Sequence, residues 1–123
     1  MFFEGELVET IKQQTGQDIF NTRIKRRMRD IIIESLQSVS ELIVPRRNTL
    51  EMYGYDFMID EDYQPYLIEV NSSPCMEYST HVTEKLVKGA LADFGKLVCD
   101  YMLNRKNIKS PEHYGGWQLI YNK

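Results

Sequence analysis

The strongest constraint on the fold is a stretch in the middle of the chain that is typical of a β-hairpin. Two short runs rich in β-branched and aromatic residues, Met52–Ile59 and Tyr66–Val70, flank an acidic turn with the sequence DEDYQP. Runs of this composition on either side of a turn predict two antiparallel strands joined by a slightly long loop. We therefore expect the rest of the chain to be organised around this hairpin.

A loop over residues 61–64 sets a register that can be tested by what it places together. It puts Asp60 opposite Pro65 and gives one consistently apolar face, with the pairs Phe57–Ile68, Tyr55–Val70 and Ile59–Tyr66. The other face receives the pairs Met58–Leu67, Gly54–Asn71 and Asp56–Glu69. Because side chains alternate with a period of two, a slip of one residue would mix the two faces.

This register predicts that the carboxylates of Asp56 and Glu69 face each other directly. Directly opposed β-carbons lie roughly 5 Å apart, and like charges in that position are destabilising. A proton or a cation between them would relieve the repulsion. Asn71, two residues farther along the same face, adds a neutral oxygen ligand, and the three together match a magnesium–nucleotide site. On spacing alone, an ordinary solvent-facing strand surface remains the alternative.

Composition places the chain among globular proteins and excludes some partners. It has 123 residues, 42% of them hydrophobic, and a net charge of −3, which is too small to argue for nucleic acid or a membrane surface. No apolar run approaches the roughly 20 residues that a membrane span needs. We expect no secretory signal, and reduced thiols at Cys75 and Cys99, as in an intracellular protein.

Helical periodicity is visible on both sides of the hairpin. Residues 4 to about 14 favour a short helix, and a stronger helix begins near Asn21 or Thr22, either of which could cap it, and ends before Pro45. The apolar positions of this stronger helix recur at three and four: Ile24, Met28, Ile31, Ile32, Leu36, Val39, Leu42 and Ile43.

A second long helix is predicted after the hairpin, from about residue 80 to 104, with Asp93 on or near its wet side. Its apolar stripe, which we interpret as core positions, is Val82, Leu86, Ala90, Phe94, Leu97, Val98 and Tyr101. The last segment, 115–121, predicts a glycine turn and a short terminal strand. The expected fold class is α+β, an antiparallel hairpin packed against two long amphipathic helices.

A basic cluster occupies the first turns of the stronger helix, at Arg23, Lys25, Arg26, Arg27 and Arg29. Such a cluster could attract a polyanion or an acidic peptide, and a plain solvated helical face is the alternative. Cations near a helix N-terminus oppose the macrodipole, which hints at an acidic neighbour. His81 and His113 are isolated in the sequence, so neither is assigned a catalytic role.

The segments YGYDFMIDED and PYLIEVNSSP resemble the C-terminal part of the tubulin–tyrosine ligase-like family, ATP-dependent amino-acid ligases with an ATP-grasp fold. The resemblance is clearest over residues 20–121 and implies that the whole chain, 1–123, is the C-terminal portion of such a domain. The segments STHVTEKLVKGALADFGKLVCDY and GGWQLIYNK look most similar to the glycine-adding branch, which joins glycine to glutamate side chains of tubulin tails.

The resemblance also implies a site and a chemistry. Asp56, Glu69 and Asn71 would hold magnesium ions that bridge the phosphates of ATP, with Glu69 and Asn71 also counted as cofactor-binding. An acceptor carboxylate would attack the γ-phosphate to give an acyl phosphate and ADP, and the amino group of the incoming amino acid would then displace phosphate. No protein nucleophile is needed, so no catalytic residue is assigned.

The implied partners are the C-terminal tails of tubulin in microtubules and a free amino acid, with glycine favoured and neither nucleic acid nor membrane involved. The implied location is the cytoplasmic cytoskeleton, and the axoneme of a cilium or flagellum for a glycine ligase. Tyrosine or glutamate ligation is the nearest alternative, because the metal motif is shared. A non-catalytic module is another, in which Arg23, Arg26, Arg27 and Arg29 bind acidic tubulin tails.

Family members carry a long segment before the matching region, with the adenine pocket and the phosphate-binding lysines. The chain by itself is therefore expected to hold half a magnesium site and no complete nucleotide site, which leaves its status as an enzyme open. We also expect it to expose a strand edge and an apolar patch.

Overall fold

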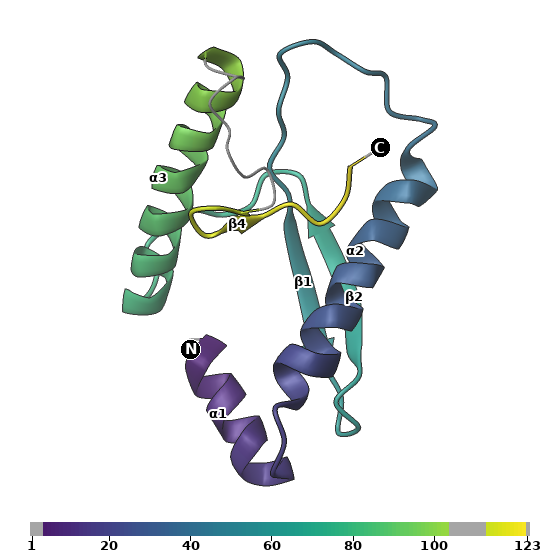
Figure 1. Ribbon diagram of the computed structural model, residues 1–123, viewed down its shortest axis with the longest axis vertical. Helices are drawn as coiled ribbons and strands as arrows, with labels where there is room; N and C mark the ends of the chain where they lie inside the picture. The colour runs from purple at the N-terminus through teal and green to yellow at the C-terminus, as the bar shows by residue number, and fades with distance from the viewer. Residues whose placement is uncertain (1–3, 104–112, 123) are drawn as a thin grey trace. The chain divides into compact units, whose positions relative to one another are not determined.

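The computed structural model describes residues 4–103 and 113–122, and the chain divides into two compact units, 1–74 and 75–123. The first unit contains α1 (Glu4–Thr15), the π-helical turn η1 (Phe20–Ile24), α2 (Lys25–Val39), β1 (Gly54–Ile59) and β2 (Pro65–Asn71). Figure 1 shows its two longer helices and the two strands. The second unit contains α3 (His81–Leu103), β3 (His113–Tyr114) and β4 (Trp117–Gln118). The mixed helix and strand content confirms the α+β class.

The core of the first unit is small and lies where α1 meets the start of the second helical segment. Ile11, Phe20 and Ile24 are its buried apolar side chains among the described residues, and Ile24 is 0% exposed. Half-buried side chains from both helices and from the turn end of the hairpin pack against these three: Val8, Ile19, Met28, Ile59 and Tyr63. The turn end of the hairpin is therefore one of the places where it is attached to the helices.

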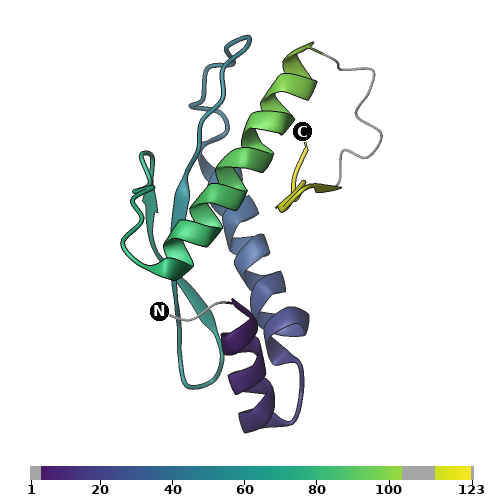
Figure 2. The ribbon, with the colours of Figure 1, turned by 90° about the vertical axis from the view of Figure 1, so that its left-hand side faces the viewer.

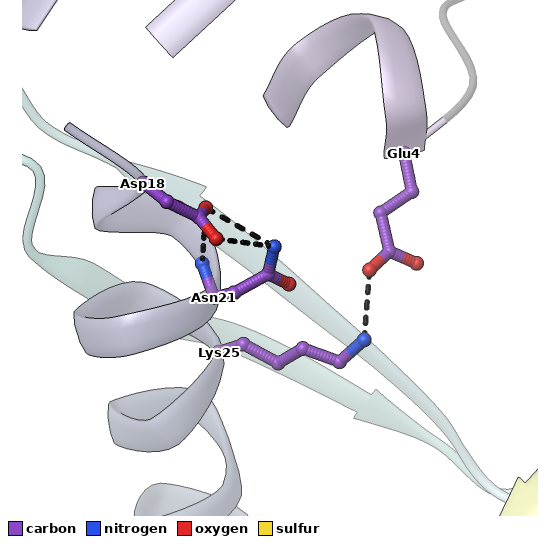
Figure 3. Close-up of polar contacts among 4 residues, drawn as sticks. All are labelled: Glu4, Asp18, Asn21 and Lys25. Atoms are coloured by element: carbon purple, nitrogen blue, oxygen red, sulfur yellow. Dashed lines mark hydrogen bonds and ion pairs between the residues drawn. The ribbon is translucent and has the colours of Figure 1, made fainter. Parts of the chain in front are cut away.

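The helical segment that leads into α2 begins earlier than expected, and its cap is neither Asn21 nor Thr22. Asp18 directly precedes the helical residues, and one oxygen of its carboxylate accepts the backbone N–H of Asn21 at 3.3 Å (Figure 3). The side-chain amide of Asn21 donates to both oxygens of the same carboxylate at 3.1 Å. A carboxylate in this position satisfies a free helical N–H and also complements the macrodipole. The predicted caps are thus wrong because Asp18 does this three residues earlier.

The other end of α2 agrees with the prediction that the helix stops before Pro45. The helix ends at Val39 and is followed by a turn. Leu42 and Ile43 lie beyond it and are 81% and 56% exposed. Their assignment to the apolar stripe of the helix is therefore wrong, since neither residue is helical or buried.

The hairpin has the predicted register at its open end only. Gly54–Asn71, Tyr55–Val70 and Asp56–Glu69 are paired as expected, whereas the turn end pairs Phe57–Leu67, Met58–Tyr66 and Ile59–Pro65. The register shifts by one residue between Asp56 and Phe57, which leaves Ile68 as the extra residue of a β-bulge in β2. The predicted pairs at the turn end are therefore wrong by one position.

The cause of this shift is a loop one residue shorter than expected. The N–H of Asp60 donates to the carbonyl of Gln64 at 3.0 Å, so Gln64 and not Pro65 faces Asp60. The Asp60 carboxylate accepts the N–H groups of Asp62 and Gln64, at 3.0 and 2.8 Å, and Tyr63 adopts a φ of 59°. A three-residue loop that ends in a left-handed residue is a common hairpin connection.

The second unit is built on α3, which Figures 1 and 2 show as one continuous helix. A Gly115–Gly116 turn joins β3 to β4, confirming the predicted glycine turn, and the N–H of Gly116 donates to the Asp93 carboxylate at 2.8 Å. The Trp117 indole donates to the carbonyl of Ala90 at 3.1 Å, and its ring lies 5.8 Å from that of Phe94. Asp93, expected on or near the wet side of the helix, is half-buried, and its carboxylate binds this turn.

Only part of the expected helix packing is confirmed. Figure 1 shows α2 lying along the hairpin, in contact with β2. The packing of α3 against the hairpin stays a prediction, and Leu86 and Tyr101 of its stripe are 56% and 54% exposed. Among the residues that the structure describes, no helix is long and apolar enough to cross a membrane.

Candidate metal centre

The outward face of the hairpin brings Asp56, Glu69 and Asn71 together, as predicted. Asp56 of β1 lies directly opposite Glu69 of β2, and Asn71 follows two residues later on the same face. Both carboxylates are exposed and Asn71 is half-buried. The cluster is therefore open to a ligand from solvent.

The β-bulge is what allows the two acids to share a face. If the pairing set by the loop continued along the strands, Ile68 would lie opposite Asp56, and Glu69 would lie opposite Tyr55 on the other face. Because Ile68 is the extra residue of the bulge, Glu69 lies opposite Asp56 and on the same face. The amino-acid sequence held no signal for the bulge, since Ile68 suits either register.

The amide of Asn71 links the two carboxylates. Its Nδ2 donates to Oε1 of Glu69 at 3.0 Å and to Oδ2 of Asp56 at 3.3 Å. An amide NH₂ group has two hydrogens, so it serves one carboxylate with each. In this conformation the nitrogen of Asn71, not the predicted oxygen, faces the acids, and a half-turn of the amide would exchange the two.

The donor set fits a magnesium ion that also binds phosphate. Mg²⁺ prefers oxygen ligands and is commonly held by one or two carboxylates together with waters and substrate phosphates. Asp56 and Glu69 supply such a pair, and Asn71 supplies an amide oxygen once rotated. Within 4–103 and 113–122, no cluster of three or more His, Cys, Asp or Glu side chains could hold a metal. Two carboxylates and one amide match the protein's share of a metal site that is completed by phosphate and water.

Large apolar side chains of the hairpin are exposed, in agreement with the expected apolar patch. Met58, Tyr66 and Ile68 are 64%, 55% and 58% exposed on the hairpin. The hydrogen bond of the Tyr66 hydroxyl with the Asp60 carboxylate, and then the negative charge of that carboxylate, raise the pKa of Tyr66. Tyr66 is therefore a neutral hydrogen-bond donor at physiological pH.

The basic cluster separates into paired and unpaired members. Lys25 Nζ lies 2.8 Å from Oε1 of Glu4 (Figure 3), and Arg27 Nη1 lies 3.2 Å from Oε1 of Glu34. Arg23, Arg26 and Arg29 are exposed and make no ion pair or hydrogen bond with the described part of the chain. Glu4 and Glu34 are thus acidic neighbours of two members of the cluster, and Asp18 adds a carboxylate at the start of the helical segment.

The fold and the site together define an α+β protein whose hairpin presents two opposed carboxylates and an amide. Comparison with known proteins identifies the family within this broad class. The profile of the tubulin-tyrosine ligase family matches residues 2–107, so the chain belongs to this family.

Several relatives are similar over most of the chain. Tubulin glycylase 3B of Tetrahymena thermophila is 42% identical over 98% of the chain, and tubulin monoglycylase TTLL3 of Homo sapiens is 37% identical over 92%. The probable tubulin polyglutamylase TTLL9 of Mus musculus is 35% identical over 77%. The matched region is only 10%, 14% and 20% of the length of these three relatives.

Proposed function

We propose that the chain is part of an ATP- and magnesium-dependent ligase that adds an amino acid, with glycine favoured, to glutamate side chains of tubulin tails. The observation that carries the proposal is the juxtaposition of Asp56, Glu69 and Asn71 on one open face. The similarity to proteins named as tubulin glycylases supports the acceptor and the amino acid. Such an enzyme would act on the cytoskeleton, and in the axoneme of a cilium or flagellum if it adds glycine.

In this proposal Asp56 and Glu69 hold the cation and Asn71 adds its amide oxygen after rotation. When bound, Mg²⁺ with ATP would neutralise phosphate charge and align the reacting groups. Asp56 and Glu69 are both exposed, so phosphate and water could complete the coordination of an ion that they would hold. The relatives are much longer than the matched region, so we propose that the rest of the site comes from other parts of the polypeptide.

The test is amino-acid incorporation by the full-length protein. Tubulin, Mg²⁺–ATP and one labelled amino acid at a time, glycine, glutamate or tyrosine, are incubated with the protein, and label on tubulin is measured by mass spectrometry. We expect glycine on glutamate side chains, with no product when ATP or Mg²⁺ is left out. Glutamate or tyrosine incorporation would establish the alternative ligase, and no incorporation of any of the three would overturn the ligase proposal.

A second function, binding of acidic tails without turnover, is favoured by the unpaired arginines. Neutralising Arg23, Arg26 and Arg29 to Gln is expected to weaken binding of an acidic tubulin-tail peptide by about threefold or more at low salt, because each exposed ion pair contributes little alone. The loss should shrink at high salt as the charges are screened. Fluorescence anisotropy of a labelled peptide measures both.

Arg27→Gln is the matched control on the same helix. Its guanidinium is engaged by Glu34, so its removal should change peptide affinity less than removal of any unpaired arginine. No effect of neutralising Arg23, Arg26 and Arg29 would show that the cluster is a plain solvated surface, and an equal loss in Arg27→Gln would show that Glu34 does not withhold Arg27 from the peptide.

A further inference from the structure

A hydrogen bond ties β1 to α2 directly behind the acidic cluster. The Ser35 hydroxyl oxygen lies 3.0 Å from that of Tyr55 and 2.7 Å from the carbonyl of Ile32. A serine hydroxyl has one proton to donate, and the Ile32 carbonyl can only accept. Tyr55 of β1 is therefore the donor, and Ser35 of α2 is the acceptor.

The place of Tyr55 in the hairpin connects this bond to the site. Tyr55 directly precedes Asp56 in β1, and its cross-strand partner Val70 lies between Glu69 and Asn71 in β2. Because neighbouring side chains of a strand point to opposite faces, Tyr55 and Val70 face away from the acids. The Tyr55–Ser35 bond thus restrains the stretch of backbone from which all three polar side chains project.

A second tyrosine offers a comparison at the other end of the hairpin. The Tyr63 hydroxyl donates to Oε1 of Gln14 in α1 at 3.2 Å. This bond also ties the hairpin to a helix, but the bulge at Ile68 separates it from Asp56 and Glu69. The two hydroxyls therefore make similar attachments at different distances from the cluster.

We propose that Tyr55, acting through Ser35, is a positioning residue that sets the Asp56, Glu69 and Asn71 side chains relative to one another. It holds β1 against α2 so that the two carboxylates stay within reach of one bridging group, the Asn71 amide or a cation. The role in cation binding rests on the proposed function, whereas the role in ordering the Asn71 amide does not.

The test compares Tyr55→Phe with Tyr63→Phe in the 123-residue chain by NMR. In the metal-free chain, the two side-chain amide protons of Asn71 report its bonds to the carboxylates, and added Mn²⁺ broadens nearby resonances in proportion to binding. Tyr55→Phe is expected to move the Asn71 amide protons toward the shifts of a free amide and to weaken Mn²⁺ affinity about tenfold. Tyr63→Phe should leave both unchanged, although it too removes one hydroxyl bond.

Ser35 variants complete the design. Ser35→Ala should reproduce the effect of Tyr55→Phe, and the double variant should be no worse than either one, because the two residues share one interaction. Ser35→Thr keeps the hydroxyl and should behave like the wild type. Unchanged Asn71 protons in Tyr55→Phe, or equal changes in Tyr63→Phe, would overturn the positioning role. A wild-type chain that shows the Asn71 effect but binds no Mn²⁺ would leave the positioning role standing and would show that cation binding needs the parts of the site that lie elsewhere in the polypeptide.

Discussion

Replacing Asp56 with asparagine is expected to lower ATP-dependent tubulin modification by the full-length protein by roughly a hundredfold or more. The substitution keeps the size of the side chain and removes the negative charge that faces Glu69 across the strand pair. A single remaining carboxylate would hold a magnesium–nucleotide much more weakly. Incorporation of labelled amino acid measures the activity, and broadening of the Glu69 and Asn71 resonances by Mn²⁺ measures the binding.

For Asp56→Asn we also expect an effect on stability, opposite in sign to the effect on activity. Like charges directly opposed on a sheet are destabilising, so Asp56→Asn should leave the metal-free chain as stable as the wild type or slightly more stable. Binding sites often lower the stability of the free protein, and two opposed carboxylates do so until a cation binds between them. Asp62→Asn, in the exposed hairpin loop, is the control that removes one acidic charge and should leave activity and Mn²⁺ broadening intact. Full activity of Asp56→Asn would show that the metal assignment is wrong.

The open end of the hairpin could be predicted from the alternation of apolar and polar residues, which favours Asp56 opposite Glu69, and the structure has that pair. The predicted loop led to the same pair only because the bulge at Ile68 compensates for its extra residue. The turn end could not be predicted, because its register depends on hydrogen bonds from backbone N–H groups to the Asp60 carboxylate. The loop length and the register at the turn end were both wrong by one residue, and the bulge at Ile68 accommodates the difference.

In the helices too, the sequence pattern predicted the elements, whereas local hydrogen bonds decided where they begin. Periodicity was enough to place α2 and α3, since each is long and its apolar residues recur at helical spacing. The start of the α2 segment was misplaced because Asp18, Asn21 and Thr22 are all acceptable caps by residue type. Only the contact between Asp18 and Asn21 decides between them. Caps depend on where the chain turns into the helix, and periodicity does not contain that information.

The candidate site was predictable in its members but not in its internal bonding. Electrostatic repulsion between Asp56 and Glu69 indicated that something must lie between them, and a proton or a cation was expected. The structure has the Asn71 amide in that position, with its nitrogen toward both acids. The same side chain can therefore satisfy the acids without a cation and offer an oxygen when a cation is bound.

The second large effect is expected at Gly115, where alanine should destabilise the docked β3–β4 hairpin by about 3 kcal/mol. A Cβ added there would lie 2.3 Å from Cγ of Asp93 and 2.4 and 2.7 Å from its carboxylate oxygens. Gly115 also has a φ of 59°, which disfavours alanine. Asp93 could rotate away only by giving up its hydrogen bond with the N–H of Gly116.

Gly116→Ala is the matched control, since its added Cβ would lie 3.6 Å from the Asp93 carboxylate, an ordinary contact, and its φ is not in the left-handed region. Trp117 is the single tryptophan of the chain, so its fluorescence reports the docking directly. Gly115→Ala should shift the emission to longer wavelength as the indole loses Phe94 and the Ala90 carbonyl, and should lower the unfolding midpoint. Gly116→Ala should change neither by much. If the two variants behave alike, Asp93 does not hold the turn, and the hairpin is attached through Trp117 alone.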